Sequence, residues 1–565
     1  MEPIEIVKQY HEQTKHEFNR YARSLGYMDW ANQPDPFRRY EGAALFKLPL
    51  LTADDAPVAP SYESLYSPET ISPQPLNLNS LSRLFEYSLS LTAWKEYGGN
   101  RWALRSNPSS GNLHPTEGYL LIRDEKNLSL EPGLYHYAPK EHGLEYRMRA
   151  SNECLEELLQ PFPPQTFLIG LSSIHWREAW KYGERAFRYC QHDIGHAIGT
   201  LRIAAATLGW RVFLLSGLDD PTVGRLLGLN RLDEFERAEP ELPELICVVC
   251  PTLDPHLELM PLTLNESAVE NCVQDDWQGK ANRLSRDNPI PWEIIDEVTK
   301  ASWKYASEQS LLPLPPSFHT TEPTSNTERP QVSAHQIVHQ RRSAVAFDGV
   351  TSISADQFFS MLDRVFPNSD RLISQRPMPW DSIPWDPTIH LALFVHRVDG
   401  LAPGMYLFLR HANPTLKDTF RESMHEQFEW TTPENCPTHL PLYLLEEGNA
   451  QRIAIQLSCT QEIAGASAFS LGMIAEFDPS LEKHGPWFYK RLFWESGLIG
   501  QVLYLEAEAV GVRATGIGCF FDDPVHRVLG WYPKTQFQSL YHFTVGGPVE
   551  DHRLTTLPPY DDQDP

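Results

Sequence analysis

The chain contains two versions of one sequence unit, and this repetition constrains the fold more than any other feature. Segment 195–210 reappears as segment 497–512, at an offset of 302 positions. Four residues recur unchanged at that offset: Gly195 as Gly497, Leu201 as Leu503, Ala205 as Ala507 and Gly209 as Gly511. Two related units in one chain favour two similar lobes about a pseudo-twofold axis, so that the chain imitates a homodimer.

Periodicity and turn residues divide the chain into four parts. Helices are predicted at 1–30, 79–96, 176–209, 292–306 and 355–365. The stretch after the first helix is rich in proline and aspartate and is expected to wrap the surface, whereas residues 255–335 have the composition of a linker. We therefore expect an N-terminal helix and wrapping segment (1–75), a first domain (76–260), a linker with one helix (261–335) and a second domain (336–565).

Composition excludes several classes of protein. The 565 residues carry a formal net charge of −26, which argues against a nucleic-acid partner. No run of 18 apolar residues predicts a membrane span, and the polar start is unlike a signal peptide, so cytoplasm is the expected location. Eight cysteines in this length do not form a disulfide framework. Cys247 and Cys250 have CxxC spacing but lie in an apolar run, which favours a buried strand over a redox or metal site.

One stretch, 104–119, concentrates turn formers and hydrogen-bonding groups before an apolar strand. Pro108 and Gly111 enforce an irregular backbone, and a flat ligand could approach the main chain at the glycine. Ser109, Ser110 and Asn112 could reach the edge of a planar heteroaromatic ring. The composition of the stretch fits a polar surface loop equally well.

The sequence LRSNPSSGNLHPTEGY of this stretch resembles the R-x-x-PSxGxxxPxExY signature of the SagB-type dehydrogenases, a branch of the FMN-dependent nitroreductase superfamily. The resemblance implies an α+β fold of two nitroreductase-like domains, each an antiparallel or mixed sheet with flanking helices, in an intrachain pseudo-homodimer. It implies FMN as cofactor. In that family one subunit supplies an Arg-rich motif, a Gly-rich loop and late basic residues, and its partner supplies the PSxGN loop.

The second unit carries the first set of family features. Arg341, Arg342 and Ser343 combine guanidinium groups with a hydroxyl, which suits a phosphate dianion. The Gly-rich loop is TGIG, with Gly516, Ile517 and Gly518, and Arg553 is the late basic residue. Val345 stands where the family often has a second basic residue, and Arg105 of the first unit is a candidate replacement.

The first unit shows the opposite pattern. It keeps Arg105, Pro108, Ser109, Ser110 and Asn112 but lacks the Arg-rich and Gly-rich motifs. The second unit has no PSxGN loop, because residues 376–394 stand in its place. The two units therefore complement each other, and we expect one composite FMN site and a degenerate second one.

The resemblance also assigns a catalytic pair. Lys181 and Tyr182 occupy the position of a Lys-Tyr pair that handles protons in SagB-type azoline dehydrogenases, and Lys483 and His484 stand at the matching offset. A desolvated lysine beside a tyrosine can act as a base. The residues alone equally fit a surface lysine beside a half-buried tyrosine.

His192 and His196 have i, i+4 spacing that could bind a metal, but without a third ligand they are expected to be core or interface histidines, and no metal site is predicted.

The expected activity is hydride transfer between flavin N5 and a small or peptide-borne substrate, such as an azoline ring in a modified peptide. Reduction of nitro or quinone compounds by NAD(P)H is an alternative within the same class. The other class is a scaffold or binding partner in a biosynthetic complex, its flavin site vestigial. Higher oligomers are left open.

Overall fold

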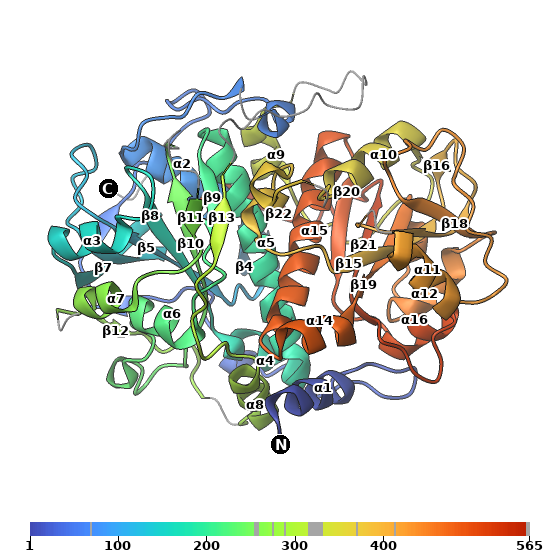
Figure 1. Ribbon diagram of the computed structural model, residues 1–565, viewed down its shortest axis with the longest axis horizontal. Helices are drawn as coiled ribbons and strands as arrows, with labels where there is room; N and C mark the ends of the chain where they lie inside the picture. Colours follow the sequence, from blue (N-terminus) through green and yellow to red (C-terminus); the bar gives the residue numbers. More distant parts are fainter. Residues whose placement is uncertain are drawn as a thin grey trace.

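The computed structural model describes residues 1–67, 70–252, 259–273, 276–287, 290–314, 332–368, 371–411 and 414–560. The described chain forms two α+β lobes that lie side by side (Figure 1). Each lobe is built on a large antiparallel sheet, as the family resemblance implies.

In the first lobe the sheet has strand order β2-β7-β6-β5-β8-β10-β9: Leu45–Lys47, Gly143–Arg149, Gly133–Ala138, Thr116–Ile122, Phe167–Ser173, Leu242–Cys250 and Arg211–Leu214. In the second lobe the order is β18-β17-β15-β19-β21-β20: Leu442–Glu447, Gly404–Phe408, Ile389–Val395, Phe469–Ala475, Gln538–Gly546 and Arg513–Ile517. From β7 to β9 and from β18 to β20 the two orders correspond strand for strand.

The offset of 302 holds for whole elements. The matched pairs are β8 with β19, α4 (His175–Tyr182) with α14 (Phe477–His484), α5 (Ala186–Thr207) with α15 (Phe488–Ala509), and α6 (Asp220–Leu227) with α16 (Asp522–Leu529). The predicted duplication is therefore a duplication of structure. Cys247 and Cys250 are buried on β10, as expected for a core strand.

The two lobes join along α5 and α15, which pack lengthwise against each other at the centre of the molecule (Figure 1). The helices cross where Gly195 faces Gly497. A Cβ atom on Gly195 would lie 2.8 Å from the Gly497 Cα and would run into the Trp494 carbonyl oxygen. Real Cβ atoms do not approach this closely, so the crossing requires glycine on both helices.

A small third sheet, β22-β3-β4, also ties the lobes together. Strand β22 (Thr555–Leu557) comes from the end of the chain and pairs with β3 (Leu91–Tyr97) of the first lobe, which pairs with β4 (Asn100–Arg105). The helix predicted over 79–96 is therefore wrong in its second half: α2 spans Leu78–Ser88 and a strand follows. A partner strand far away in sequence decides this segment's conformation.

Two other predicted helices are shorter or interrupted. Helix α1 spans Pro3–Gln13 rather than 1–30, because the chain beyond Thr14 turns to bond the second lobe, where the Asp522 carboxylate accepts from the His16 amide. The helix predicted over 176–209 is broken between α4 and α5 at Gly183, whose φ is 57°.

The segment 261–335, which was predicted to be a linker with one helix, contains more helices and strands than predicted. Within its described residues, α7 (Glu266–Cys272) precedes α8 (Glu293–Ala301), and β11 (Leu259–Pro261) pairs with β13 (Leu311–Pro313). Residues 315–331 of the predicted linker lie outside the described residues.

The remaining elements lie around the sheets. They are the helices α3 (Asn152–Leu159), α9 (Ala334–Gln340), α10 (Ala355–Arg364), α11 (Pro414–Ser423), α12 (Gln451–Leu457) and α13 (Ile463–Ala466), and the short strands β1 (Tyr40–Glu41), β12 (Lys280–Ala281), β14 (Ile353–Ser354) and β16 (Val398–Asp399). Helix α10 confirms the helix predicted at 355–365.

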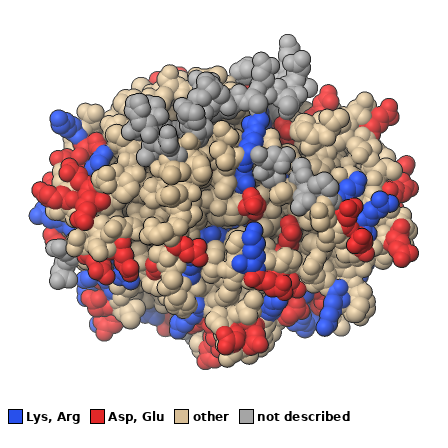
Figure 2. Space-filling model, in the orientation of Figure 1, with Lys and Arg blue, Asp and Glu red and all other residues tan. Residues whose placement is uncertain are grey.

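Acidic side chains spread over both lobes on the face shown in Figure 2, with basic side chains between them. Among the described residues, no helix combines the length and the apolar composition that a membrane crossing needs.

Gly195→Ala should destabilise the protein by about 1–3 kcal/mol, because the new methyl group forces α5 and α15 apart. Gly224→Ala is the matched control on helix α6, where the nearest atom to a new Cβ lies 3.6 Å away at Pro243. It should be neutral or stabilising, because alanine favours a helix by up to about 1 kcal/mol over glycine. Urea unfolding of both variants tests this, and equal stabilities would contradict the close crossing.

Candidate functional site

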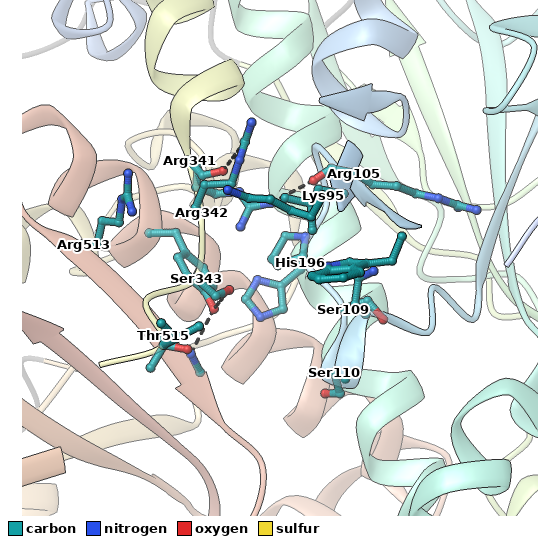
Figure 3. Close-up of a pocket in the computed structure, with 18 of the residues that line it drawn as sticks. Lys95, Arg105, Ser109, Ser110, His196, Arg341, Arg342, Ser343, Arg513 and Thr515 are labelled. Carbon is teal, nitrogen blue, oxygen red and sulfur yellow. Dashed lines mark hydrogen bonds between the residues drawn. The ribbon is translucent and has the colours of Figure 1, made fainter. Parts of the chain in front are cut away.

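A cavity of about 720 Å³ lies between the lobes (Figure 3). The first lobe lines it with the signature loop, residues 108–112, and the second lobe with residues 341–343. These two segments were predicted to share one site although more than 200 positions separate them in the chain. The structure brings them to one cavity.

The signature loop has an unusual backbone. Gly111, Asn112 and His114 all have positive φ, of 60°, 60° and 51°. A Cβ atom on Gly111 would lie 2.5 Å from the Tyr182 hydroxyl oxygen and 2.9 Å from Lys181 Nζ. The absence of a side chain at Gly111 therefore lets the predicted catalytic pair reach the loop.

Side chains of the loop hold its shape. Ser109 Oγ accepts a hydrogen bond from the His114 amide at 2.8 Å, and Asn112 Nδ2 donates to the Ala103 carbonyl at 2.6 Å. Ser110 keeps its hydroxyl on the cavity side, where Figure 3 shows it below His196. Pro108 lines the cavity as well.

The opposite end of the cavity is basic. Arg341 donates to the Arg105 carbonyl at 2.8 Å, and Arg342 donates to the His339 carbonyl at 2.9 Å. Ser343 Oγ lies 2.8 Å from the Tyr504 hydroxyl. Within the described chain neither arginine has a carboxylate in ion-pair distance, and burial together with Arg341 lowers the pKa of Arg342 to about 10. Glu508 accepts from the Arg342 amide at 3.2 Å and compensates these charges only in part, so a bound anion would add favourable interactions here.

Two further cations line this end, and neither was among the predicted site residues. Lys95 comes from β3, which was expected to be helical, and Arg513 begins β20. Arg513 forms an ion pair with Glu550 at 2.7 Å. Arg513 lies 302 positions after Arg211, and this repeat position is the feature of the sequence that could have identified it.

Two predicted cofactor residues are placed differently from the prediction. Arg105 belongs to the cavity wall, but its charged group does not enter the cavity. The guanidinium of Arg105 points away from the cavity (Figure 3) and donates to the carbonyls of Pro36 and Thr116, so it does not replace the missing basic residue at Val345. Arg553 lies outside the cavity lining, with its side chain 73% exposed and paired with Asp551.

The Gly-rich loop contributes only its first part to the cavity wall. Gly516 lines the cavity, whereas Ile517 is buried in the core of the second lobe. At Gly518 an added Cβ would collide with the Tyr189 ring. Thr515, which the prediction omitted, lines the cavity beside Gly516.

Two buried carboxylates stand behind the signature loop. Asp193 Oδ1 accepts from the Ser110 amide at 3.2 Å, and Glu178 Oε1 accepts from Ser109 Oγ at 3.4 Å. Burial raises the pKa of Asp193 to about 8, and burial together with Asp193 raises the pKa of Glu178. The pair therefore holds a proton at neutral pH, at the wall of the cavity.

The two histidines on α5 are interface residues, as predicted. His192 stacks on Tyr541 with 4.1 Å between ring centroids. His196 lines the cavity, lies 3.3 Å from both the Gln501 amide oxygen and the Tyr541 hydroxyl, and has its pKa lowered to about 3 by burial. Neither belongs to a metal-ligand cluster among the described residues.

The place related to the cavity by the offset of 302 is filled. Arg202 and Arg211, the counterparts of Tyr504 and Arg513, both donate to the buried carboxylate of Asp381, at 2.7 and 2.9 Å. Asp381 belongs to the segment that replaces the PSxGN loop. A cavity of only about 20 Å³ remains nearby, lined by Leu214 and Leu245.

The cavity also presents polar atoms without a partner within the described part of the chain. They are Arg341 Nε, His114 Nδ1 and Asp193 Oδ2, and all are buried. Buried polar groups are normally satisfied, so these atoms fit a bound ligand that carries both hydrogen-bond donors and acceptors.

Comparison with known proteins agrees with this geometry. Residues 72–238 match the Nitroreductase family. The match lies in the first lobe, which is therefore similar to the Nitroreductase family over these residues.

Two curated proteins are similar to parts of this chain. The trifolitoxin-processing protein TfxB of Rhizobium leguminosarum bv. trifolii is 28% identical over 195 residues, which cover 33% of this chain and 46% of TfxB. The candidate nitroreductase MJ1384 of Methanocaldococcus jannaschii is 24% identical over 162 residues, covering 28% of this chain and 76% of MJ1384.

One solved structure matches both lobes together. A candidate nitroreductase from Anabaena variabilis superposes with a TM-score of 0.67 over 96% of this chain and 99% of its own, at 23% sequence identity. This likeness shows that the two lobes of the chain share their fold with a solved structure.

Asp193→Asn should change how stability depends on pH in the ligand-free protein. The folded state raises the pKa of Asp193 from 3.8 to about 8, so the native carboxyl binds a proton that the unfolded chain has lost, and stability falls as pH rises across this window. The side-chain amide of the variant does not titrate, so the variant avoids this loss of stability. The variant should therefore gain in melting temperature relative to the parent between pH 5 and pH 8.

Asp381→Asn is the control. Arg202 and Arg211 hold the pKa of Asp381 below its usual value despite burial, so its stabilisation is complete at both pH values. This variant should lose stability by the same amount at pH 5 and pH 8. If the melting temperatures of Asp193→Asn and of the parent changed with pH in the same way, Asp193 would carry no proton in the folded protein.

Proposed function

We propose that this chain is an FMN-dependent oxidoreductase of the SagB-type dehydrogenase kind, with one composite flavin site between its lobes. The observation that carries the proposal is the cavity of about 720 Å³ that joins the signature loop of one lobe to the Arg341–Ser343 segment of the other. The intrachain pseudo-homodimer supplies both halves of a site that homodimers of this superfamily build from two subunits.

The basic end of the cavity fits the phosphate of FMN. Guanidinium groups bind phosphate oxygens with two parallel hydrogen bonds, and the Ser343 hydroxyl adds a short donor. Among the described residues no carboxylate forms an ion pair with Arg341 or Arg342, although the nearby charge of Glu508 acts to raise the pKa of both. Lys95 and Arg513 stand in for the basic residue missing at Val345.

The other end of the cavity fits the ring system. Pro108–Asn112 would orient the ring, and Gly111 leaves room for it against the main chain. The Asp193 carboxyl, the Ser110 hydroxyl and His196 offer polar groups at its edge. FMN would supply hydride acceptance and donation at this place.

Lys181 and Tyr182 are proposed to handle the proton that accompanies hydride transfer. Their Nζ and hydroxyl oxygen converge behind Gly111, and burial together with Glu178 raises the pKa of the Tyr182 hydroxyl, which keeps its proton at neutral pH. The Tyr182 hydroxyl would hold the proton, and Lys181 Nζ would exchange it with the carboxyl pair of Glu178 and Asp193.

The substrate class is a small or peptide-borne ring. The name of TfxB, a processing protein for a peptide toxin, supports a modified peptide, such as one that carries an azoline ring. NAD(P)H-driven reduction of a nitro or quinone compound is the alternative reaction at the same site.

A single site per chain follows from the filled counterpart. The Asp381 carboxylate already satisfies Arg202 and Arg211, so no phosphate is needed there. Trp380, which belongs to the same segment as Asp381, is fully buried, and the Arg410 guanidinium lies over its ring.

The purified chain should bind one FMN, and Arg342→Ala should weaken FMN binding by about ten- to a hundredfold, because a charge-assisted hydrogen bond contributes about 1.5–3 kcal/mol. Arg553→Ala is the control, since that exposed arginine lies outside the cavity, and its affinity should stay within about twofold. Flavin absorbance and fluorescence titration measure both. A colourless protein that FMN cannot reconstitute would favour the scaffold function, and two flavins per chain would contradict the single site.

Lys181→Ala and Tyr182→Phe should each lower turnover by about a hundredfold or more at unchanged FMN content, the size expected for loss of general acid–base catalysis. Lys483→Ala removes the matching lysine of the other lobe and should leave turnover unchanged. Both an azoline-containing peptide and NAD(P)H with a quinone serve as assays. Full turnover in the first two variants would exclude the proton-transfer role.

A further inference from the structure

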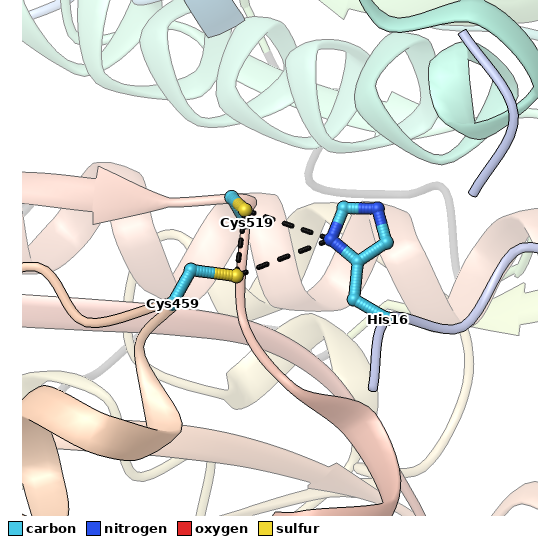
Figure 4. Close-up of side chains that lie close together, drawn as sticks. All are labelled: His16, Cys459 and Cys519. Carbon is cyan, nitrogen blue, oxygen red and sulfur yellow. Dashed lines mark hydrogen bonds between the residues drawn. The ribbon is translucent and has the colours of Figure 1, made fainter. Parts of the chain in front are cut away.

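Three side chains with nucleophilic or basic character gather where the N-terminal segment meets the second lobe (Figure 4). Cys459 lies in the turn after α12, Cys519 follows β20, and His16 follows α1. The two Sγ atoms are 2.6 Å apart, and His16 Nδ1 lies 3.5 Å from Cys519 Sγ and 4.0 Å from Cys459 Sγ. None of the three lines the cavity between the lobes.

The approach of the two sulfurs is built into the backbone. Cys459 and Thr460 both have positive φ, of 52° and 58°, a conformation that non-glycine residues rarely adopt and that points to a specific constraint. The two turns are hydrogen-bonded to each other: the Phe521 amide donates to the Leu457 carbonyl at 2.8 Å, and Gln461 Nε2 donates to the Cys519 carbonyl at 3.2 Å.

The surroundings favour a thiolate on Cys519. The pKa of the Cys519 thiol is lowered to about 5, mainly by its hydrogen bond with Cys459 and further by the hydrogen bond with His16 and the charge of Arg185. Burial acts in the opposite direction. Asp522, which pairs with Arg185, and the hydroxyl of Tyr21 also face the pair. Both cysteines are partly exposed, so small reagents reach them.

We propose that Cys459 and Cys519 form a reversible dithiol–disulfide site that reacts with low-molecular-weight disulfides. The Cys519 thiolate attacks one sulfur of the small disulfide, forms a mixed disulfide and releases one thiolate. Cys459 then attacks the Cys519 sulfur, closes the intramolecular disulfide and releases the second small thiol, which takes the Cys459 proton. Two protein thiols are oxidised and one small disulfide is reduced.

The same three side chains are also of the Cys2His type that binds zinc. Two thiolates on one tetrahedral zinc ion stand about 3.8 Å apart for bonds of about 2.3 Å. The sulfurs here are closer than that and need to close by only about 0.6 Å to reach a disulfide length of about 2.05 Å. The geometry therefore favours the disulfide.

A disulfide here would tie the turn after α12 to the chain directly after β20. Thr515 and Gly516 of β20 line the cavity, so the cross-link would fasten one cavity wall. The proposal does not rest on the flavin, since it concerns only these thiols.

The test uses the full chain, reduced with a phosphine, freed of reductant and treated with oxidised glutathione. Two of the eight thiols should disappear, and peptide mapping without reductant should find Cys459 joined to Cys519. Cys459→Ser should accumulate the glutathione mixed disulfide on Cys519. In the untreated protein, iodoacetamide at pH 7 should modify Cys519 at least tenfold faster than Cys436, a partly buried thiol whose pKa burial raises to about 11.

Cys436→Ser is the control variant and should form the cross-link as the parent does. His16→Gln should move the pH midpoint of Cys519 alkylation upward. Three outcomes would overturn the proposal: eight thiols that persist in excess oxidised glutathione, a cross-link between other cysteines, or one tightly bound zinc ion that blocks oxidation and is lost from Cys459→Ser, Cys519→Ser and His16→Gln alike.

Discussion

The contact of Gly195 with Gly497 sets the geometry of the whole molecule. With two glycines at the crossing, α5 and α15 approach until backbone meets backbone, and the two sheets are held at a fixed distance on either side. The cavity wall depends on this distance, because His196 and Asp193 on α5 line the same cavity as Tyr504 on α15 and Gly516 on β20. A wider crossing would separate the two halves of the site.

The halves also exchange chain segments. The Ser343 backbone runs beside Ala514 of β20, and β22 from the far end of the chain completes a sheet with β3 of the first lobe. The N-terminal segment is fastened by a buried ion-pair network in which Arg185 and Arg188 share the Asp522 carboxylate at 3.0 and 2.8 Å. Burial of two cations and one anion is tolerable because Thr14 accepts further hydrogen bonds from both arginines.

Duplication in one chain frees each copy to lose what the other keeps. A homodimer must carry every site residue in both subunits, whereas here the segment that replaces the second PSxGN loop fills its own place with Asp381 and Trp380. The Asp381 carboxylate takes the position between two arginines that an anionic ligand would need. Buried polar pairing is thus retained at the position that corresponds to the basic end of the cavity.

The sequence by itself determined the duplication, the offset of 302 and the two lobes, because a repeated pattern of core residues can pack in only a few ways. It also located the signature loop and the Arg341–Ser343 segment, whose residue types express local chemistry. The tertiary structure decided the rest. Lys95 lines the cavity only because β22 pairs with β3, and Arg105 turns away only because the Pro36 and Thr116 carbonyls accept its hydrogen bonds. The raised pKa of Asp193 and the meeting of Cys459 with Cys519 likewise depend on burial and on contacts between distant segments, which no local pattern of residues encodes.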